Sequence, residues 1–158
     1  MGTVSPERPA GPVRPVAAVG AVAFDERGRV LLVRRGHPPE QSAWSVPGGR
    51  IEPGERVTEA VAREMAEETG LQVAVLGLVA AIDWIERAPG GELVRHFVIL
   101  DHLVEVLGGE LAAGDDADEA EWFALDELAR LTTTAGLVDV IERARAMAAG
   151  LATPPRLR

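Results

Sequence analysis

Three glutamates, Glu64, Glu67 and Glu68, are spaced so that a helix would place their carboxylates on one face. Residues at i, i+3 and i+4 are neighbours on a helix surface. Like charges at this spacing destabilise a helix by about 0.2–0.5 kcal/mol per pair, and carboxylates that lie close together resist simultaneous ionisation. A compensating positive charge is therefore expected beside these side chains.

Arg63 can supply part of that charge, because it can pair along a helix with Glu59 or Glu67. It lies about 100° round the helix from Glu64, so one arginine is not expected to neutralise all three glutamates. A hard divalent cation can, because Mg²⁺ and Mn²⁺ prefer carboxylate, carbonyl and water oxygens. The alternative is an exposed acidic face with surface ion pairs, which is what a charge run usually means. The glutamates alone do not decide between these hypotheses.

A helix from about Val57 to Thr69 would present the glutamates, with Thr58 as its N-cap and Gly70 just past its end. The opposite side of this helix is small and apolar and would pack on a sheet: Val61, Ala62 and Met65.

Apolar runs that fit strands flank this helix. Before it, residues 16–24 and 30–33 lie on either side of a turn-like segment and predict a hairpin, and residues 44–47 predict a short strand. After it, the pattern predicts strands at 73–84 and 94–106 in a second hairpin, a loop at 108–118, a short strand at 122–124 and a helix at 137–148. Together these elements predict an α/β (α+β) fold, in which helices pack on the faces of a mixed sheet.

The length of 158 residues fits one domain, which we expect over residues 14–151. Residues 1–13 carry prolines among small polar residues without an apolar period, and residues 152–158 are similar, so they are expected to be a flexible leader and a flexible tail. The run 16–24 resembles the apolar part of a signal peptide, but its proline-rich lead is long and a strand explains it.

Composition excludes several classes of function. The chain has no cysteine, which excludes disulfides and thiolate-held metal centres and fits a reducing compartment, with the cytoplasm as the default. The net charge of −9 argues against a protein that grips long nucleic acids, because that affinity comes from cationic side chains on phosphates. The sequence also lacks an apolar run of the about 20 residues that a membrane span requires.

The spacing around the glutamates is the most specific signal in the chain. Five residues separate Gly49 from Glu55, and seven more separate Glu55 from Arg63. The positions that follow in register are Glu64, Met65, Glu67, Glu68, Gly70 and Leu71. This pattern resembles the Nudix box, which is Gly, five residues, Glu, seven residues, then Arg-Glu-apolar-x-Glu-Glu-x-Gly-apolar, and every fixed position matches. Since each residue type makes up about a tenth or less of a sequence, the seven invariant positions match by chance with a probability of about 10⁻⁷ per starting point.

The resemblance implies an α/β/α sandwich around a mixed sheet, with the box forming a loop, a helix and a loop. It implies hydrolysis of a nucleoside diphosphate linked to another moiety, with Mg²⁺ (or Mn²⁺) as cofactor. By the same resemblance, Glu67 and Glu68 are metal ligands, Glu64 is a further ligand or the general base, and the Gly48 carbonyl is a possible ligand. The remaining box residues would orient the ligands or shape the loop, as the resemblance implies for Arg63, Glu55, Gly49 and Gly70.

Members of the family often carry an additional carboxylate, a ligand or a base, on a later loop. Here the acidic segment 114–119 offers several candidates, and we rank Asp116 above Asp115 and Glu119. The alternative is a solvated acidic turn, because such loops are commonly charged. Asp116 therefore joins the glutamates and Arg63 as a candidate catalytic residue.

The substrate is a small nucleotide diphosphate, by the same resemblance. Arg50 directly follows Gly48-Gly49 and is the favoured phosphate contact, with Arg34 and Arg35 as weaker candidates. Candidates to stack on a base are Trp84, Phe97 and Trp44, although aromatics in strand patterns more often pack against neighbours.

Three functions are consistent with these residues. The segment from 95 to 101, with 108–111 and the acidic loop, is similar to the ADP-ribose pyrophosphatase branch, which favours ADP-ribose or another nucleotide sugar. The second function is a MutT-like pyrophosphohydrolase of nucleoside triphosphates. The third is a sensor that binds a nucleotide without cleaving it, which the intact glutamates disfavour. A homodimer is possible, since the family often dimerises.

Overall fold

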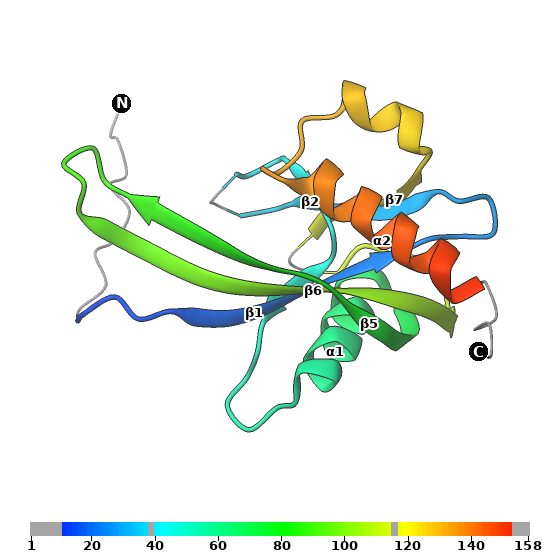
Figure 1. The fold of residues 1–158 in the computed structure, drawn as a ribbon, viewed down its shortest axis with the longest axis horizontal. Helices are drawn as coiled ribbons and strands as arrows, with labels where there is room; N and C mark the ends of the chain where they lie inside the picture. The colour runs from blue at the N-terminus through cyan, green and yellow to red at the C-terminus, as the bar shows by residue number, and fades with distance from the viewer. Residues whose placement is uncertain (1–10, 38–39, 115–116, 153–158) are drawn as a thin grey trace, which may run out of the picture.

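The computed structural model describes residues 11–37, 40–114 and 117–152. Within these residues the chain forms a four-stranded sheet, a three-stranded sheet, two α-helices and a short 3-10 helix (Figure 1). In chain order the elements are β1 (Val16–Ala23), β2 (Val30–Arg35), β3 (Trp44–Ser45), β4 (Gly48–Arg50), α1 (Val57–Thr69), β5 (Leu71–Arg87), β6 (Leu93–Gly109), β7 (Ala117–Phe123), η1 (Leu125–Arg130) and α2 (Leu137–Ala152).

The four-stranded sheet has the order β4-β1-β6-β5 and is mixed. β1 runs parallel to β6, whereas β4 is antiparallel to β1 and β5 is antiparallel to β6. The second sheet, in the order β3-β2-β7, is antiparallel. The predicted second hairpin is confirmed, but β5 and β6 are longer than expected and extend beyond the helices and the three-stranded sheet (Figure 1).

The prediction that residues 16–24 and 30–33 pair as a hairpin is wrong, because β1 and β2 lie in different sheets. A tight turn does join β1 to β2, and Phe24 pairs with Val30 in a single bridge. Beyond that bridge the strands enter different sheets, because both edges of β1 are occupied by β4 and β6. The predicted loop 108–118 is also too long at both ends, since β6 continues to Gly109 and β7 begins at Ala117, where it pairs with β2.

Side chains along β1 point alternately to two apolar cores, which places α1 and α2 on opposite sides of the four-stranded sheet (Figure 1). The core on the α1 side contains Val19, Ala21, Ala23, Leu31, Ala60, Val61, Met65, Leu71 and Val104. The core on the α2 side contains Val22, Val30, Leu32, Leu103, Phe123, Leu128, Leu137, Val140, Ile141 and Ala144. The predicted sandwich of helices around a mixed sheet is confirmed. None of the described helices is long and apolar enough to cross a membrane.

Helix α1 spans the predicted residues, but Thr58 is not its N-cap. The cap is Arg56, whose backbone N–H donates to Glu59 Oε2 at 2.9 Å. This bond satisfies the Arg56 N–H. It is one half of a capping box, in which the side chain of the glutamate three residues later accepts from the backbone N–H of the cap residue. At the other end Gly70 has φ of 73° and its N–H donates to Ala66 O, as predicted for a C-cap glycine.

Candidate active site

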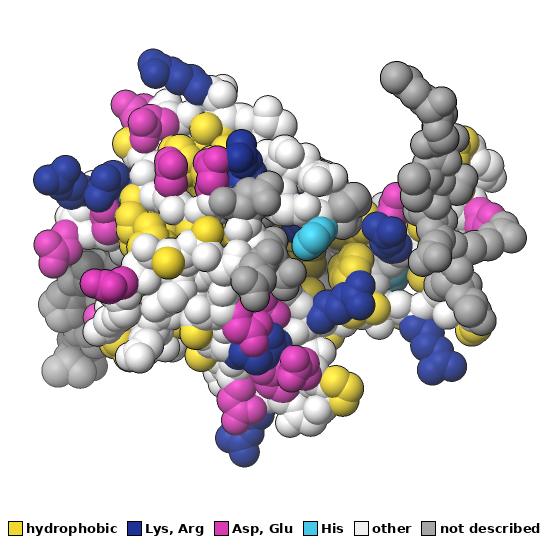
Figure 2. Space-filling model, turned by 180° about the vertical axis from the view of Figure 1, so that it is seen from behind, with side chains coloured by type: hydrophobic (Ala, Val, Ile, Leu, Met, Phe, Trp, Pro, Cys, Tyr) yellow, Lys and Arg dark blue, Asp and Glu magenta, His cyan; other side chains and the backbone are white. Residues whose placement is uncertain are grey.

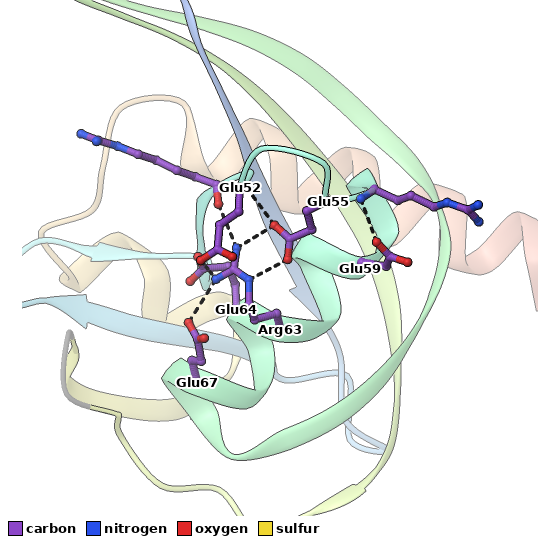
Figure 3. Close-up of polar contacts among 8 residues, drawn as sticks. Glu52, Glu55, Glu59, Arg63, Glu64 and Glu67 are labelled. Atoms are coloured by element: carbon purple, nitrogen blue, oxygen red, sulfur yellow. Dashed lines mark hydrogen bonds and ion pairs between the residues drawn. The ribbon is translucent and has the colours of Figure 1, made fainter.

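The guanidinium of Arg63 binds three of the box carboxylates (Figure 3). It grips Glu55 with two hydrogen bonds, from Nε to Oε1 at 2.7 Å and from Nη2 to Oε2 at 3.0 Å. Nη1 donates to Glu64 Oε1 at 2.8 Å and to Glu67 Oε2 at 3.1 Å, and Nη2 also reaches the carbonyl of Arg50 at 2.9 Å. Arg63 thereby ties β4, the following loop and α1 together.

This arrangement decides one alternative for Arg63 and corrects one expectation. It pairs with Glu67 as predicted, but Glu59 serves the helix N-terminus instead. Arg63 also reaches Glu64, although the two Cα atoms lie on different sides of the helix, because the long side chain folds back across the surface. The position of Arg63 between Glu64 and Glu67 shows that these carboxylates can share one positive charge.

The pKa values of Glu55 and Glu64, which both accept hydrogen bonds from Arg63, change in opposite directions. The hydrogen bonds from Arg63 lower the pKa of Glu55 below its ordinary value. Burial raises the pKa of Glu64, and Arg63 opposes that rise without cancelling it. The positive charge of Arg63 thus does not fully offset the burial of Glu64. A further cation would stabilise the charged form of this carboxylate.

Glycines make room for the carboxylates at the start of the box. The backbone N–H of Gly48 donates to Glu68 Oε2 at 2.9 Å, which brings the end of α1 to the edge strand β4. A Cβ at Gly48 would lie 2.1 Å from the backbone oxygen of Val19, and a Cβ at Gly49 would lie 2.3 Å from Glu64 Oε1. Both positions therefore require glycine if β4 is to pair with β1 and Glu64 is to keep its place.

The donor set fits a hard divalent cation in chemistry, because Glu64, Glu67, Glu68 and the Gly48 carbonyl all offer oxygen. Among the residues that the structure describes, no three acidic or histidine side chains are already gathered at metal-binding spacing. Glu67 is turned towards Arg63, and 59% of its side chain is exposed. Its Oε2 accepts from Arg63 Nη1 at 3.1 Å, so Arg63 sets the position of this carboxylate beside the box.

A cavity of about 500 Å³ opens between the two sheets, beside Gly48 and Glu68. Its lining includes the α2-facing side of the four-stranded sheet, the end of β2 and the start of α2. The basic side chains that line it include Arg34, Arg35, His37, Arg50 and Arg95. Apolar side chains form much of its inner wall, among them Val46, Ile82, Ile99, Leu137 and Val140. Figure 2 shows basic side chains beside exposed apolar ones on one face of the molecule.

The three predicted substrate-binding residues meet at one end of this cavity. The Trp84 and Phe97 rings lie 5.8 Å apart, and the Arg50 guanidinium carbon lies 5.5 Å from the Phe97 ring centroid. A guanidinium at that distance is attracted by the ring, so Phe97 holds Arg50 at the cavity. Trp44, the other aromatic candidate, packs instead against Phe123 in the core.

Other predicted residues already have partners or lie outside the part of the chain that the structure describes. Arg34 lines the cavity but forms an ion pair with Glu119 of β7, so each of these two candidates already has a partner. Asp115 and Asp116 lie outside the described residues. The proposed role of Asp116 therefore stays a prediction.

Asp101 is a cavity residue that the sequence analysis did not single out. It lies on β6, is only 4% exposed, and its Oδ1 has no hydrogen-bond partner among the described residues. Burial raises the pKa of Asp101 to about 6. The available signal was one acid within the otherwise apolar run of residues 97–104, which contains only one other polar residue, His102.

We expect Asp101→Asn to stabilise the protein at about pH 8 and to have little effect at about pH 4. The pKa of Asp101 is about 6 in the folded chain and has an ordinary value of 3.8, so the folded chain binds this proton more tightly. The contribution of Asp101 to the free energy of unfolding is therefore most favourable below about pH 4. It is lost as the pH rises through 6, by about 3 kcal/mol in total. Urea unfolding of both proteins across this range measures the difference. A difference in free energy of unfolding that does not change with pH would contradict a raised pKa for Asp101.

Comparison with known proteins places this site in a family. The NUDIX domain family profile matches residues 14–144. An ADP-ribose pyrophosphatase of Methanocaldococcus jannaschii is 41% identical over 119 residues, which cover 75% of this chain and 68% of that protein. The chain belongs to the Nudix family. The resemblance inferred from the box is confirmed, and with pyrophosphatases among its relatives the chain is a Nudix hydrolase.

Solved structures of Nudix proteins have the same fold. A MutT NUDIX hydrolase from Burkholderia pseudomallei gives a TM-score of 0.71 at 32% identity, covering 82% of this chain and 98% of that one. The NUDIX domain of Shewanella oneidensis NrtR, solved in complex with ADP ribose, gives 0.72 at 21% identity, covering 89% and 92%. Several other curated relatives are longer, and this Nudix chain spans 30% to 39% of their length.

Proposed function

We propose that this Nudix hydrolase cleaves the diphosphate bond of ADP-ribose or a related nucleotide sugar. The observation that carries the proposal is the single cavity that joins Gly48 and Glu68 to the cluster of Arg50, Phe97 and Trp84. A diphosphate with an organic group at each end needs a charged centre flanked by apolar surface, and the cavity offers both. The ADP-ribose pyrophosphatase among the relatives supports this substrate class.

Nudix hydrolases generally use a divalent cation, and we propose Mg²⁺ or Mn²⁺ here, held by Glu67, Glu68, Glu64 and the Gly48 carbonyl. When bound, the cation would neutralise phosphate charge and lower the pKa of a water molecule. Glu68 is positioned for this by the Gly48 N–H.

Several residues would act on the substrate or on the ligands. Arg50 would contact a phosphate, and the rings of Trp84 and Phe97 would contact an organic group of the substrate. Arg63 would orient Glu64 and Glu67, and Glu55 would orient Arg63. The general base would be Glu64 or a carboxylate near Asp116.

The absence of cysteine favours a cytoplasmic location.

The product pattern tests the proposal. The purified chain is incubated with Mg²⁺ and, separately, ADP-ribose, nucleotide sugars, dinucleoside polyphosphates and nucleoside triphosphates, and the products are separated by chromatography. We expect AMP and ribose 5-phosphate from ADP-ribose, with kcat/KM at least about tenfold above that for the triphosphates. Nucleoside monophosphate and pyrophosphate as the main products would instead establish the MutT-like activity, which the similarity to a MutT NUDIX hydrolase favours. Tight binding without turnover would indicate a sensor.

A further inference from the structure

The position of the Asp101 carboxyl is fixed by the backbone of the neighbouring strand, although its Oδ1 has no hydrogen-bond partner among the described residues. In the four-stranded sheet Asp101 is in register with Gly20 of β1, and Gly20 is in register with Gly48 of β4. A Cβ at Gly20 would lie 2.0 Å from Asp101 Oδ1 and 3.1 Å from Val46 Cγ2. The carboxyl therefore lies over Gly20, in the space that a side chain would otherwise fill, and faces the cavity beside Val46.

A structural role does not account for this residue. A buried polar atom without a hydrogen bond destabilises a protein, and a buried carboxylate does so more strongly. Asp101 Oδ1 is buried without a partner among the described residues, so the carboxyl lowers stability where it stands. A water molecule, an ion or a ligand in the adjoining cavity would supply a hydrogen bond to this carboxyl.

The chemistry of the cavity restricts that ligand. A carboxylate accepts hydrogen bonds and repels anions, so the group that reaches Asp101 carries N–H or O–H donors and is not a phosphate. The walls on this side are aliphatic, with Val46, Ile99 and Val140 among them. A ribose would leave several hydroxyls unpaired against such walls. A flat nucleobase instead offers apolar faces to such walls and an amino donor at its edge.

The spacing from the phosphate side is also suitable. Gly48, which donates to Glu68, and Asp101 are two strands apart in the sheet, which corresponds to about 10 Å between backbones. That separation is comparable with the distance from the 5′-phosphate to the amino group in an extended AMP unit. Trp84 and Phe97 pair four residues further along the strands, about 13 Å from Asp101, and so would contact another part of the substrate.

We propose that Asp101 is a specificity-determining residue, whose carboxylate accepts a hydrogen bond from the exocyclic amino group of the substrate's adenine. The inference rests on the proposed function in that the substrate carries adenine. It adds that the base lies in the inner, aliphatic part of the cavity, away from the pair of aromatic rings. Recognition of the base by the inner cavity would be separate from turnover, so it can be measured as binding.

Calorimetric titration of the full chain without metal tests this role. The two ligands are AMP and purine riboside 5′-monophosphate, which lacks only the amino group. We expect wild-type protein to bind AMP at least about tenfold more tightly, and Asp101→Leu to bind both ligands equally. Asp101→Asn keeps an acceptor oxygen and should retain part of the preference. Glu105→Gln, the same acid-to-amide change at an exposed site on β6, should leave the ratio of the two dissociation constants unchanged.

Stability separates this role from a structural one. Asp101→Leu should melt at a higher temperature than wild type at about pH 8, because it removes a buried unpaired carboxylate. Equal binding of both ligands by wild type, no AMP binding at all, or an unchanged preference in Asp101→Leu would each overturn the inference. Hydrolysis of ADP-ribose is measured separately with Mg²⁺, so loss of the inference leaves the proposed function standing. If ADP-ribose is not hydrolysed but the AMP preference depends on Asp101, the proposed function fails alone.

Discussion

Glu68→Gln is expected to lower kcat for ADP-ribose hydrolysis on the order of a thousandfold. The amide oxygen can still accept the hydrogen bond from the Gly48 N–H, so the contact between α1 and β4 survives. What is lost is the negative charge and an oxygen that a divalent cation binds well. We therefore expect the fall in activity without a comparable fall in melting temperature, and a higher Mg²⁺ concentration for half-maximal activity.

The matched control is Glu59→Gln on the same helix. Glu59 is exposed and accepts from the Arg56 backbone N–H, which a glutamine oxygen can also do. Its activity should stay within about twofold of wild type, because surface substitutions of this kind have small effects. A fully active Glu68→Gln enzyme would remove Glu68 from the proposed metal site.

The elements that sequence patterns predicted are those defined by local rules. Helix α1 ends where expected because Gly70 adopts the left-handed conformation that terminates helices, and its glutamates share a face because of the helical period. The box spacing identified the family because it is a long register of fixed residue types. The first residue of α1 was also predicted correctly, but its N-cap was not, because Glu59 satisfies the Arg56 N–H without help from Thr58.

What sequence patterns missed depends on contacts between distant segments. The separation of β1 and β2 into different sheets follows from the competing edges of β4, β6 and β7, which no local turn signal reports. Asp101 is brought to the cavity by its register with Gly20, about eighty residues away along the chain. Its importance lies in the absence of a partner, which can be recognised only once its surroundings are known.

The two acids of the site that are most affected by burial have different surroundings. Glu64 is half-buried but bonded to Arg63, and burial still raises its pKa. Asp101 is more deeply buried and forms no ion pair with an arginine among the described residues, and burial raises its pKa to about 6. The first arrangement would be completed by a cation and the second by a neutral hydrogen-bond donor. The two ends of a nucleotide offer these in turn, through metal-bound phosphates and a base.

Arg63→Ala is the second substitution from which we expect a large effect, a fall in kcat/KM of about ten- to a hundredfold. Arg63 does not contact substrate in our proposal and acts by holding Glu64, Glu67 and the loop that carries Glu55 (Figure 3). Without it, these carboxylates repel one another, and the Arg50 carbonyl loses its donor. The melting temperature should fall as well, because one side chain connects β4, the loop and α1.

Three further variants separate this positioning role from simple loss of charge. Arg63→Lys keeps the charge but not the planar fork, so it should recover only part of the activity, since an ammonium cannot make the paired contact with Glu55. Arg56→Ala, an exposed arginine at the start of the same helix, should leave kcat/KM nearly unchanged. Glu55→Gln should lower activity in wild type but add little in the Arg63→Ala background, because both changes break the same contact. Full additivity of these two losses would show that Glu55 acts independently of Arg63, and would contradict the network seen around its guanidinium.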